Sequence, residues 1–347
     1  MKIRRLHMNI KDIAALANVG VSTVSRVINN HPDVHEETRK KVLEIIKENN
    51  YVPNNSARIL KQSSTTNIGI LVKGVFNPFF SEILKSVTVG IQKAGYTMIF
   101  QYHQDKEDTH YKSDIGTLLG FIKEKRLQGI ICLGGNFVDL TDEDLEKVDI
   151  PIVLLSVGTV TWQHLKRCSS ISINNEVAAY KATEHLIRNG HQNIGLILGE
   201  KLDFGVSKAR YEGYKKALKD YNIREKDDYI AYGEYEYEAA YKIGKKMLEN
   251  HSELTAFFAI SDIMAVGVAK ASVDLGRKIG EDLSIIGFDG MEIAKYYHPS
   301  ITTMKQPKDK MGQLSVELLL ELLHKKIENK HICLEVELVE GQSCHTI

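Results

Sequence analysis

The sequence is poor in the residues that build cross-linked or metal-held frameworks. Its four cysteines are scattered with no C-x-x-C spacing, which disfavours both a zinc site and a disulfide. They are Cys132, Cys168, Cys333 and Cys344. Cys132 lies in the apolar run 129–134 and is expected to be a small buried hydrophobe. We therefore expect neither a metal nor a cofactor.

Long apolar runs and catalytic motifs are also missing. No stretch approaches the ~18 apolar residues of a membrane span, and the basic residues of 1–14 have no apolar segment behind them. We accordingly expect no secretion signal and a cytoplasmic protein. The chain has no G-x-S-x-G, P-loop, H-E-x-x-H or strand-linked G-x-G-x-x-G, so an enzyme is not expected.

Charge is balanced overall but unevenly distributed. Residues 1–62 carry 11 Lys and Arg against six Asp and Glu, whereas the remaining residues carry 34 against 39. A basic head on an acidic body is the asymmetry expected when only the head binds a polyanion.

Most of the chain alternates short apolar strands with amphipathic helices. Strands that are apolar on both faces and separated by helices indicate parallel sheets. The expected strands form two series, and the NIGILV that opens the first resembles the NIGLIL that opens the second. They are 67–72, 96–100, 129–134 and 150–155, then 193–198, 228–233, 256–261 and 283–288. The pattern predicts two similar α/β lobes.

The first fifty residues differ, because they favour three short helices. Asn9 is a plausible N-cap. In the second helix, Val24, Val27 and Ile28 can pack inward and leave Val21, Ser22, Ser25, Arg26 and Asn29 outside. A recognition helix in the major groove of DNA needs such a polar outer face. A solvated amphipathic helix is the competing interpretation, and the basic head favours DNA.

The outer residues suit different contacts with a duplex. Arg26 could bind a guanine with two hydrogen bonds, and Val21 could contact a thymine methyl. Thr23 and Ser25 are better placed for phosphates, which position the protein but specify little.

These segments also carry a family resemblance. Residues 8–340 resemble the lac repressor family of bacterial transcription regulators, and residues 1–7 look like an extension. The matching segments include TVSRVIN, VHEETRKKV, YVPNNSARIL, NPFF, HLIRNGHQNIGLI, KARYEGY, SDIMAVG, LGRKIGEDLSIIGFD and HPSITTMKQP. The resemblance implies a head that binds DNA as a homodimer and a body that resembles periplasmic sugar-binding proteins.

The resemblance assigns roles in the head. Val21, Ser22 and Arg26 match positions that contact bases, and Ala57 and Leu60 match hinge-helix positions that enter the minor groove. Leu60 would then act as an apolar wedge that kinks the duplex. Gly20 stands where the family usually has a serine N-cap, and glycine still caps acceptably.

The implied architecture has three parts. Residues 1–52 form the helix-turn-helix head, 53–66 the hinge helix and linker, and 67–347 the body. Within the body, lobe one is expected at about 67–162 and 292–324. Lobe two is expected at about 163–291 and 325–340.

The resemblance also implies an effector site between the lobes, at the carboxyl ends of strands. Its candidates are Phe76, Phe79, Phe80, Trp162, Arg210, Asp262 and Asp289. Arg210 and Asp262 match effector-contacting positions of the family, and a guanidinium with a carboxylate suits sugar hydroxyls. The phenylalanines could instead be core, Trp162 could cover the hinge, and each aspartate could cap the helix that follows it.

We therefore predict a DNA-binding transcription regulator, a repressor, whose operator affinity is controlled by a small effector. Purine-responsive members of the family carry an arginine where this chain has Phe204, which favours a sugar. The alternatives are a sugar-binding receptor without DNA function and a regulator that answers to a phosphoprotein partner.

Overall fold

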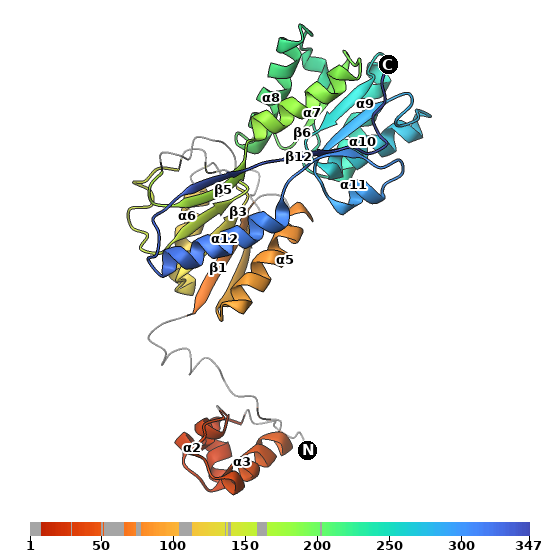
Figure 1. The fold of residues 1–347 in the computed structure, drawn as a ribbon. Coiled ribbons are helices and arrows are strands. Elements are labelled where there is room, and N and C mark those ends of the chain that lie inside the picture. The colour runs from red at the N-terminus through yellow and green to blue at the C-terminus, as the bar shows by residue number, and fades with distance from the viewer. Residues whose placement is uncertain are drawn as a thin grey trace. The chain divides into compact units, whose positions relative to one another are not determined.

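A computed structural model describes most of the chain. The described residues are 8–28, 30–49, 51, 66–73, 78–103, 113–135, 137, 140–157, 165–201 and 203–347. The chain divides into two compact units, Met1–Thr65 and Thr66–Ile347, which we call the head and the body (Figure 1). The described elements of the head are helical, and the body holds two sheets, as the sequence predicts.

The head packs three helices around a small core. They are α1 (Ile10–Ala17), α2 (Val21–Ile28) and α3 (Glu36–Glu48). Asn9 caps α1 as predicted, since its side chain accepts a hydrogen bond from the Lys11 amide, while Asp12 accepts one from the Asn9 amide. Ile13, Val24 and Val42 are fully buried and supply one residue from each helix to the core.

Lobe one of the body contains a six-stranded parallel sheet with strand order β11-β5-β4-β3-β1-β2. Its strands are β1 (Asn67–Lys73), β2 (Thr97–His103), β3 (Gly129–Leu133), β4 (Ile152–Leu155), β5 (Ser169–Ile173) and β11 (His331–Leu334). Its helices are α5 (Pro78–Lys93), α6 (Ser113–Lys125) and α12 (Lys308–Leu323). Successive residues of β1 point to opposite faces: Ile70 joins the core that includes α5 and α12, and Leu71 joins the core that includes α6.

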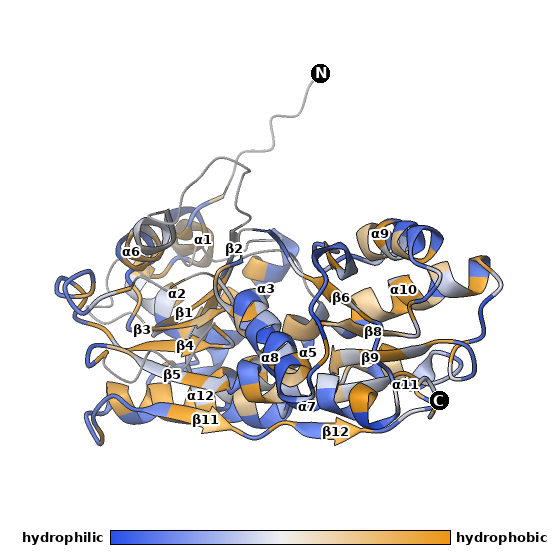
Figure 2. Ribbon diagram, turned by 90° about the horizontal axis from the view of Figure 1, so that it is seen from above, coloured by the Kyte–Doolittle hydropathy of each residue, from blue (hydrophilic) through white to orange (hydrophobic). Residues whose placement is uncertain are grey.

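Lobe two repeats this plan with strand order β12-β10-β9-β8-β6-β7, and only β12 is antiparallel to its neighbour. Its strands are β6 (Ile194–Leu198), β7 (Ile230–Tyr232), β8 (Ala256–Ala259), β9 (Ser284–Asp289), β10 (Thr302–Lys305) and β12 (Glu337–Val339). Its helices are α7 (Asn175–Arg188), α8 (Val206–Asp220), α9 (Tyr237–Asn250), α10 (Asp262–Asp274) and α11 (Glu292–Tyr296), with a 3-10 turn at Asp227–Tyr229. Figure 2 shows the hydrophobic strands of both lobes between layers of helices.

The boundaries predicted for the lobes need correction. Strands β5 and β11 belong to lobe one, and α11 and β10 belong to lobe two. The chain therefore crosses between the lobes after β5, after β10 and after β11. Sequence analysis did not predict β5, because its segment SSISI contains more serines than apolar residues. Its first two serines are buried and bonded, since the Ser169 hydroxyl donates to Asn329 and that of Ser170 pairs with the His331 ring.

Two close helix contacts depend on glycine. A Cβ on Gly213 of α8 would lie 2.2 Å from the Glu176 carbonyl oxygen of α7. A Cβ on Gly312 of α12 would lie 2.8 Å from the Ile83 carbonyl oxygen of α5. These glycines let α7 pack on α8 and α5 pack on α12, and the second pair lies beside the crossover that leaves β10. No helix among the described residues is long and apolar enough to cross a membrane.

Candidate functional site

The outer face of α2 carries the residues predicted to contact DNA. Val21 is 41% exposed, although it is a large apolar side chain, and Ser22 and Arg26 are exposed beside it. Thr23 and Ser25 are partly buried at the sides of the helix. Val24 and Val27 are buried as predicted. The helix therefore presents one arginine, small hydroxyls and one apolar side chain, which is a surface suited to base edges and phosphates.

The neighbouring loop is held by an arginine that the sequence did not single out. Arg39 of α3 donates to the Asn30 side chain at 2.6 Å and to the His31 carbonyl. Asn30 follows α2 closely and has a left-handed backbone, with φ of 52°. Arg39 thus holds the chain that follows α2 against α3. In the sequence, Arg39 is a basic residue on a charged helix. Nothing there distinguishes it from a basic residue that only faces solvent.

Five predicted site residues lie outside the described residues. In the head and linker these are Asn29, Ala57 and Leu60, and in the body they are Phe76 and Trp162. The segments 74–77, 104–112 and 158–164, which follow β1, β2 and β4, also lie outside the described residues. The site that can be described belongs mainly to lobe two and to the crossover after β10.

Arg210 of α8 is the centre of that site. It is only 4% exposed, and its Nε donates to the Asn175 side chain at 2.9 Å. Its guanidinium also donates to the Ile260 carbonyl and lies 3.6 Å from the centre of the Phe288 ring. These contacts join the ends of β8 and β9 to α7. They leave the guanidinium fixed in position at the carboxyl edge of the sheet.

Asp289, the last residue of β9, faces Arg210. Its Oδ1 lies 3.8 Å from the Arg210 guanidinium and accepts a hydrogen bond from the Gln306 amide at 2.8 Å. Its backbone is strained, with φ of 104°. Burial raises the pKa of this carboxyl, against the opposing positive charges of Arg210 and Lys308. Asp289 does not cap α11, whose N-cap is Met291, so that alternative is wrong.

Asp262 is fully buried at the first position of α10. Its two carboxylate oxygens each accept a 2.6 Å hydrogen bond, one from the Met291 amide and one from the Thr303 hydroxyl. Burial, followed by the nearby Asp289 charge, raises its pKa. Ser261 is the N-cap of α10, so the capping alternative for Asp262 is also wrong. In this arrangement Asp262 anchors the loop after β9, and its contact with an effector stays a prediction.

Two residues missed by sequence analysis complete the arrangement. Gln306 is 1% exposed, and its Oε1 is a buried acceptor without a hydrogen-bond partner among the described residues. The charges of Arg210 and Asp289 act on the hydroxyl of Tyr235, which donates a hydrogen bond to Asp203 at 2.8 Å. Tyr235 follows Glu234, and both have positive φ, of 54° and 55°. Such strain at consecutive non-glycine residues is typical of functional sites, but it leaves no mark in a sequence.

The described phenylalanines take different positions on α5. Phe79 is 3% exposed and belongs to the core, and Phe80 is half-buried against that core, with the two ring centres 5.5 Å apart. Phe204 is 46% exposed in lobe two. The core interpretation therefore describes where Phe79 lies, and the effector roles of Phe79 and Phe80 stay predictions.

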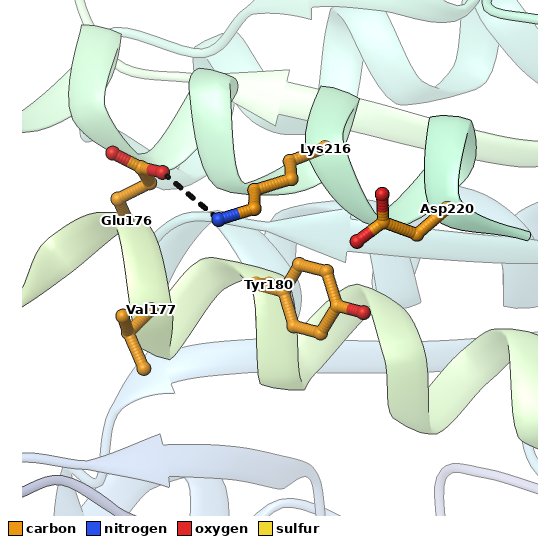
Figure 3. Close-up of a pocket in the computed structure, with 5 residues that line it drawn as sticks. All are labelled: Glu176, Val177, Tyr180, Lys216 and Asp220. Carbon is orange, nitrogen blue, oxygen red and sulfur yellow. Dashed lines mark ion pairs between the residues drawn. The ribbon is translucent and has the colours of Figure 1, made fainter.

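A separate surface pocket of about 270 Å³ lies between α7 and α8 (Figure 3). Val177, Tyr180 and Asp220 line it together with Glu176 and Lys216, which form an ion pair at 3.8 Å. Both partners of that pair are about half exposed. Three of the five lining residues are charged, whereas a ligand pocket is lined mostly by apolar and aromatic side chains. We therefore assign it no ligand.

Both the head and the body match known protein families. Residues 9–54 match the family described as "Bacterial regulatory proteins, lacI family", and residues 183–344 match the "Periplasmic binding protein-like domain". The HTH-type transcriptional regulator MalR of Clostridium butyricum is 54% identical over 340 residues, which cover 98% of this chain and all of the relative.

Two solved structures are similar over nearly the whole chain. The lac repressor dimer bound to operator and the anti-inducer ONPF has a TM-score of 0.72 at 26% identity, covering 98% of this chain and 100% of that one. The complex of the transcriptional regulator CelR with cellobiose has a TM-score of 0.69 at 26% identity, covering 97% and 99%. The similarity thus extends to proteins whose solved forms hold an operator or a sugar.

Proposed function

Because this chain belongs to the LacI family of bacterial transcription regulators, we propose that its effector is a sugar bound at the carboxyl edge of the lobe-two sheet. The family makes the chain a DNA-binding regulator whose operator affinity is controlled by an effector. The proposed action is regulation by binding, with no catalytic step. A homodimer would place two heads on the two halves of an operator.

The buried pair of Arg210 and Asp289 is the single observation that carries the sugar proposal. A guanidinium donates and a carboxylate accepts, so together they match neighbouring hydroxyls of a sugar. The free acceptor of Gln306 adds a position for one more hydroxyl. The cellobiose complex of a structurally similar regulator supports this class of ligand.

In the head, we propose that Val21, Ser22 and Arg26 contact base edges, and that Thr23 and Ser25 contact phosphates. Exposure of the first three on one face of α2 supports this division. Asn29 would extend the same contact surface, and Ala57 and Leu60 would enter the minor groove. We place the protein in the cytoplasm, where operator DNA is found.

A ligand screen tests the effector. The full chain would be mixed with cellobiose, maltose, lactose, glucose or hypoxanthine, and unfolding of the body would be followed by differential scanning calorimetry. A ligand at one hundred times its Kd stabilises the folded state by about 2.7 kcal/mol. We expect at least one sugar to do so with the wild type and with Arg26→Ala, and not with Arg210→Ala. Stabilisation by hypoxanthine alone, or by no sugar in the panel, would contradict the proposal.

A second measurement tests control of DNA binding. Selection from randomised duplexes would yield the operator, and its Kd would be measured with and without the sugar found above. We expect the sugar to change the operator Kd, because an effector shifts occupancy by its differential affinity for two states of the protein. An unchanged Kd at saturating sugar would show that the sugar binds without regulating.

A further inference from the structure

Lys308 is a buried cation in an unfavourable place. It is the first residue of α12 and follows Pro307 directly, at the point where the chain returns from lobe two to lobe one. A positive charge in the first turn of a helix opposes the helix dipole. The residue is only 8% exposed, so its ammonium also loses most of its hydration. An arrangement that is unfavourable on both counts needs compensating partners.

The partners of Lys308 come from both lobes. On the lobe-two side, Nζ donates to the Gly290 carbonyl at 2.6 Å and to the Asp289 carbonyl at 3.3 Å. On the lobe-one side, it forms an ion pair at 2.9 Å with Glu82 of α5, whose side chain is 37% exposed. We call this group the Lys308 clasp: Lys308, Glu82 and the carbonyls of residues 289 and 290.

The turn held by the clasp is a strained one. Asp289 has φ of 104° and Gly290 has φ of 65°, and a Cβ on Gly290 would lie 2.5 Å from Lys305 Cγ. The Gly290 amide donates to the Thr303 hydroxyl at 3.2 Å. With both carbonyls bound to one ammonium, the turn keeps the conformation that points the Asp289 carboxylate at Arg210.

We propose that Lys308 is a positioning residue of the effector site, and that the clasp couples that site to lobe one through Glu82. The coupling to an effector rests on the proposed function, whereas the mechanical role of the clasp does not. A movement of the turn at residues 289–290 would pull the ammonium from its carbonyl partners. A buried ammonium cannot be left with a single partner at low cost, so Lys308 and α5 have to follow.

This coupling gives lobe one a defined response. Helix α5 follows β1, the strand that begins just after the linker, so a displacement of α5 acts on the part of the body nearest the head in sequence. The clasp therefore favours one arrangement of the lobes, and an effector that moves Asp289 shifts the balance toward another.

Distance measurements between spin labels test the mechanical role without any effector. Labels would be placed on two exposed positions of the full chain, by Lys93→Cys on α5 and Glu249→Cys on α9, in a Cys333→Ser, Cys344→Ser background. Dilution with unlabelled chain removes distances between subunits. We expect Glu82→Ala and Lys308→Met each to broaden the interlobe distance distribution or to shift it by several ångströms.

The matched controls are Lys85→Ala on α5 and Lys310→Ala on α12, both of which remove exposed charges from the same helices. They should leave the distribution unchanged. Glu82 is partly exposed, so Glu82→Ala keeps the test valid if Lys308→Met fails to fold, and circular dichroism reports on both. A wild-type distribution in folded Glu82→Ala would overturn the clasp.

The coupling has its own readout once a sugar is known to bind. For Glu82→Ala we expect a sugar Kd within about threefold of wild type. The ratio of its operator Kd with sugar to that without sugar should lie at least fivefold closer to one than the wild-type ratio. A normal ratio in this variant would refute the coupling. If no sugar binds the wild type, the proposed effector fails, and the spin-label result still decides whether the clasp holds the lobes.

Discussion

The head and the body place their polar residues in opposite ways. On α2, Ser22 and Arg26 are exposed and stand ready for a partner. In lobe two, Arg210, Asp262 and Asp289 are at most 4% exposed and already bonded to one another or to the backbone. Side chains that only contact a partner can stay solvated, at no cost to folding. The charged side chains of lobe two are built into the fold instead, and burial of such groups costs free energy unless they are paired.

The same contrast holds for the backbone. In the body, the strained residues Asp289, Glu234 and Tyr235 lie at the ends of strands next to the candidate effector site. In the described part of the head, Asn18 and Asn30 have positive φ, and asparagine tolerates that conformation well. Arg126, Ser156 and Lys325 of the body also have positive φ, so the described parts of the two units differ mainly in residue type: most such positions of the body are not asparagine.

The largest expected effect is on the stability of the body, from replacement of its buried arginine. We expect Arg210→Ala to lower the free energy of unfolding of the body by about 3–5 kcal/mol, because it leaves a buried carboxylate without its ion-pair partner. Chemical denaturation would measure the loss. Lys208→Ala, an exposed change on the same helix, should alter stability by less than about 0.5 kcal/mol. A loss below 1 kcal/mol for Arg210→Ala would show that the pair is not coupled to folding.

Acid should weaken the body through His191. This residue is fully buried between Thr255, Ser284 and the His345 carbonyl. Burial lowers its pKa from 6.5 to about 4. Between these values the unfolded chain binds a proton that the folded chain does not, so the stabilisation is complete above pH 6.5 and is lost as the pH falls toward 4.

The variant His191→Gln isolates this effect from the buried carboxylates, whose raised pKa values give the opposite trend. We expect the stability of wild type relative to His191→Gln to fall by about 2–3 kcal/mol between pH 7 and pH 4. Urea unfolding at several pH values would measure it. A difference that does not change with pH would mean that folding leaves the pKa of His191 unchanged.

Recognition of DNA should depend on Arg26 without any change in stability. We expect Arg26→Ala to reduce discrimination between operator and random duplex by about 1–3 kcal/mol, roughly fivefold to 150-fold, because one bidentate base contact is lost. Competition binding at fixed salt would give the ratio of the two Kd values. Lys11→Ala, which removes another exposed charge from the head, should leave this ratio unchanged. An unchanged ratio in Arg26→Ala, with weaker binding to both duplexes, would assign Arg26 to phosphates.

The sequence predicted most of the fold because parallel strands buried on both faces are apolar throughout, as in the 67–72 and 193–198 segments. It failed at β5, where buried serines replace apolar residues, and this error moved the first lobe boundary. Among the site candidates, Arg210 came from the family resemblance, and Asp289 from its position after the strand expected at 283–288. Gln306, Lys308 and Tyr235 were missed, because burial and partner geometry give them their importance, and an isolated polar letter shows neither.

The smallest effect compares the same substitution in both units. Asn9 caps α1 of the head and Asn174 caps α7 of the body, each through its side-chain oxygen. Replacing an N-cap asparagine by alanine costs about 1 kcal/mol. The head has a core of only six buried apolar residues, Ile13, Ala14, Ala17, Val24, Val27 and Val42, among those described. We therefore expect Asn9→Ala to lower the midpoint of the thermal transition of the head. This shift should be several degrees larger than the one that Asn174→Ala causes in the transition of the body, as scanning calorimetry would show. Equal shifts would mean that the head does not unfold as a unit of its own.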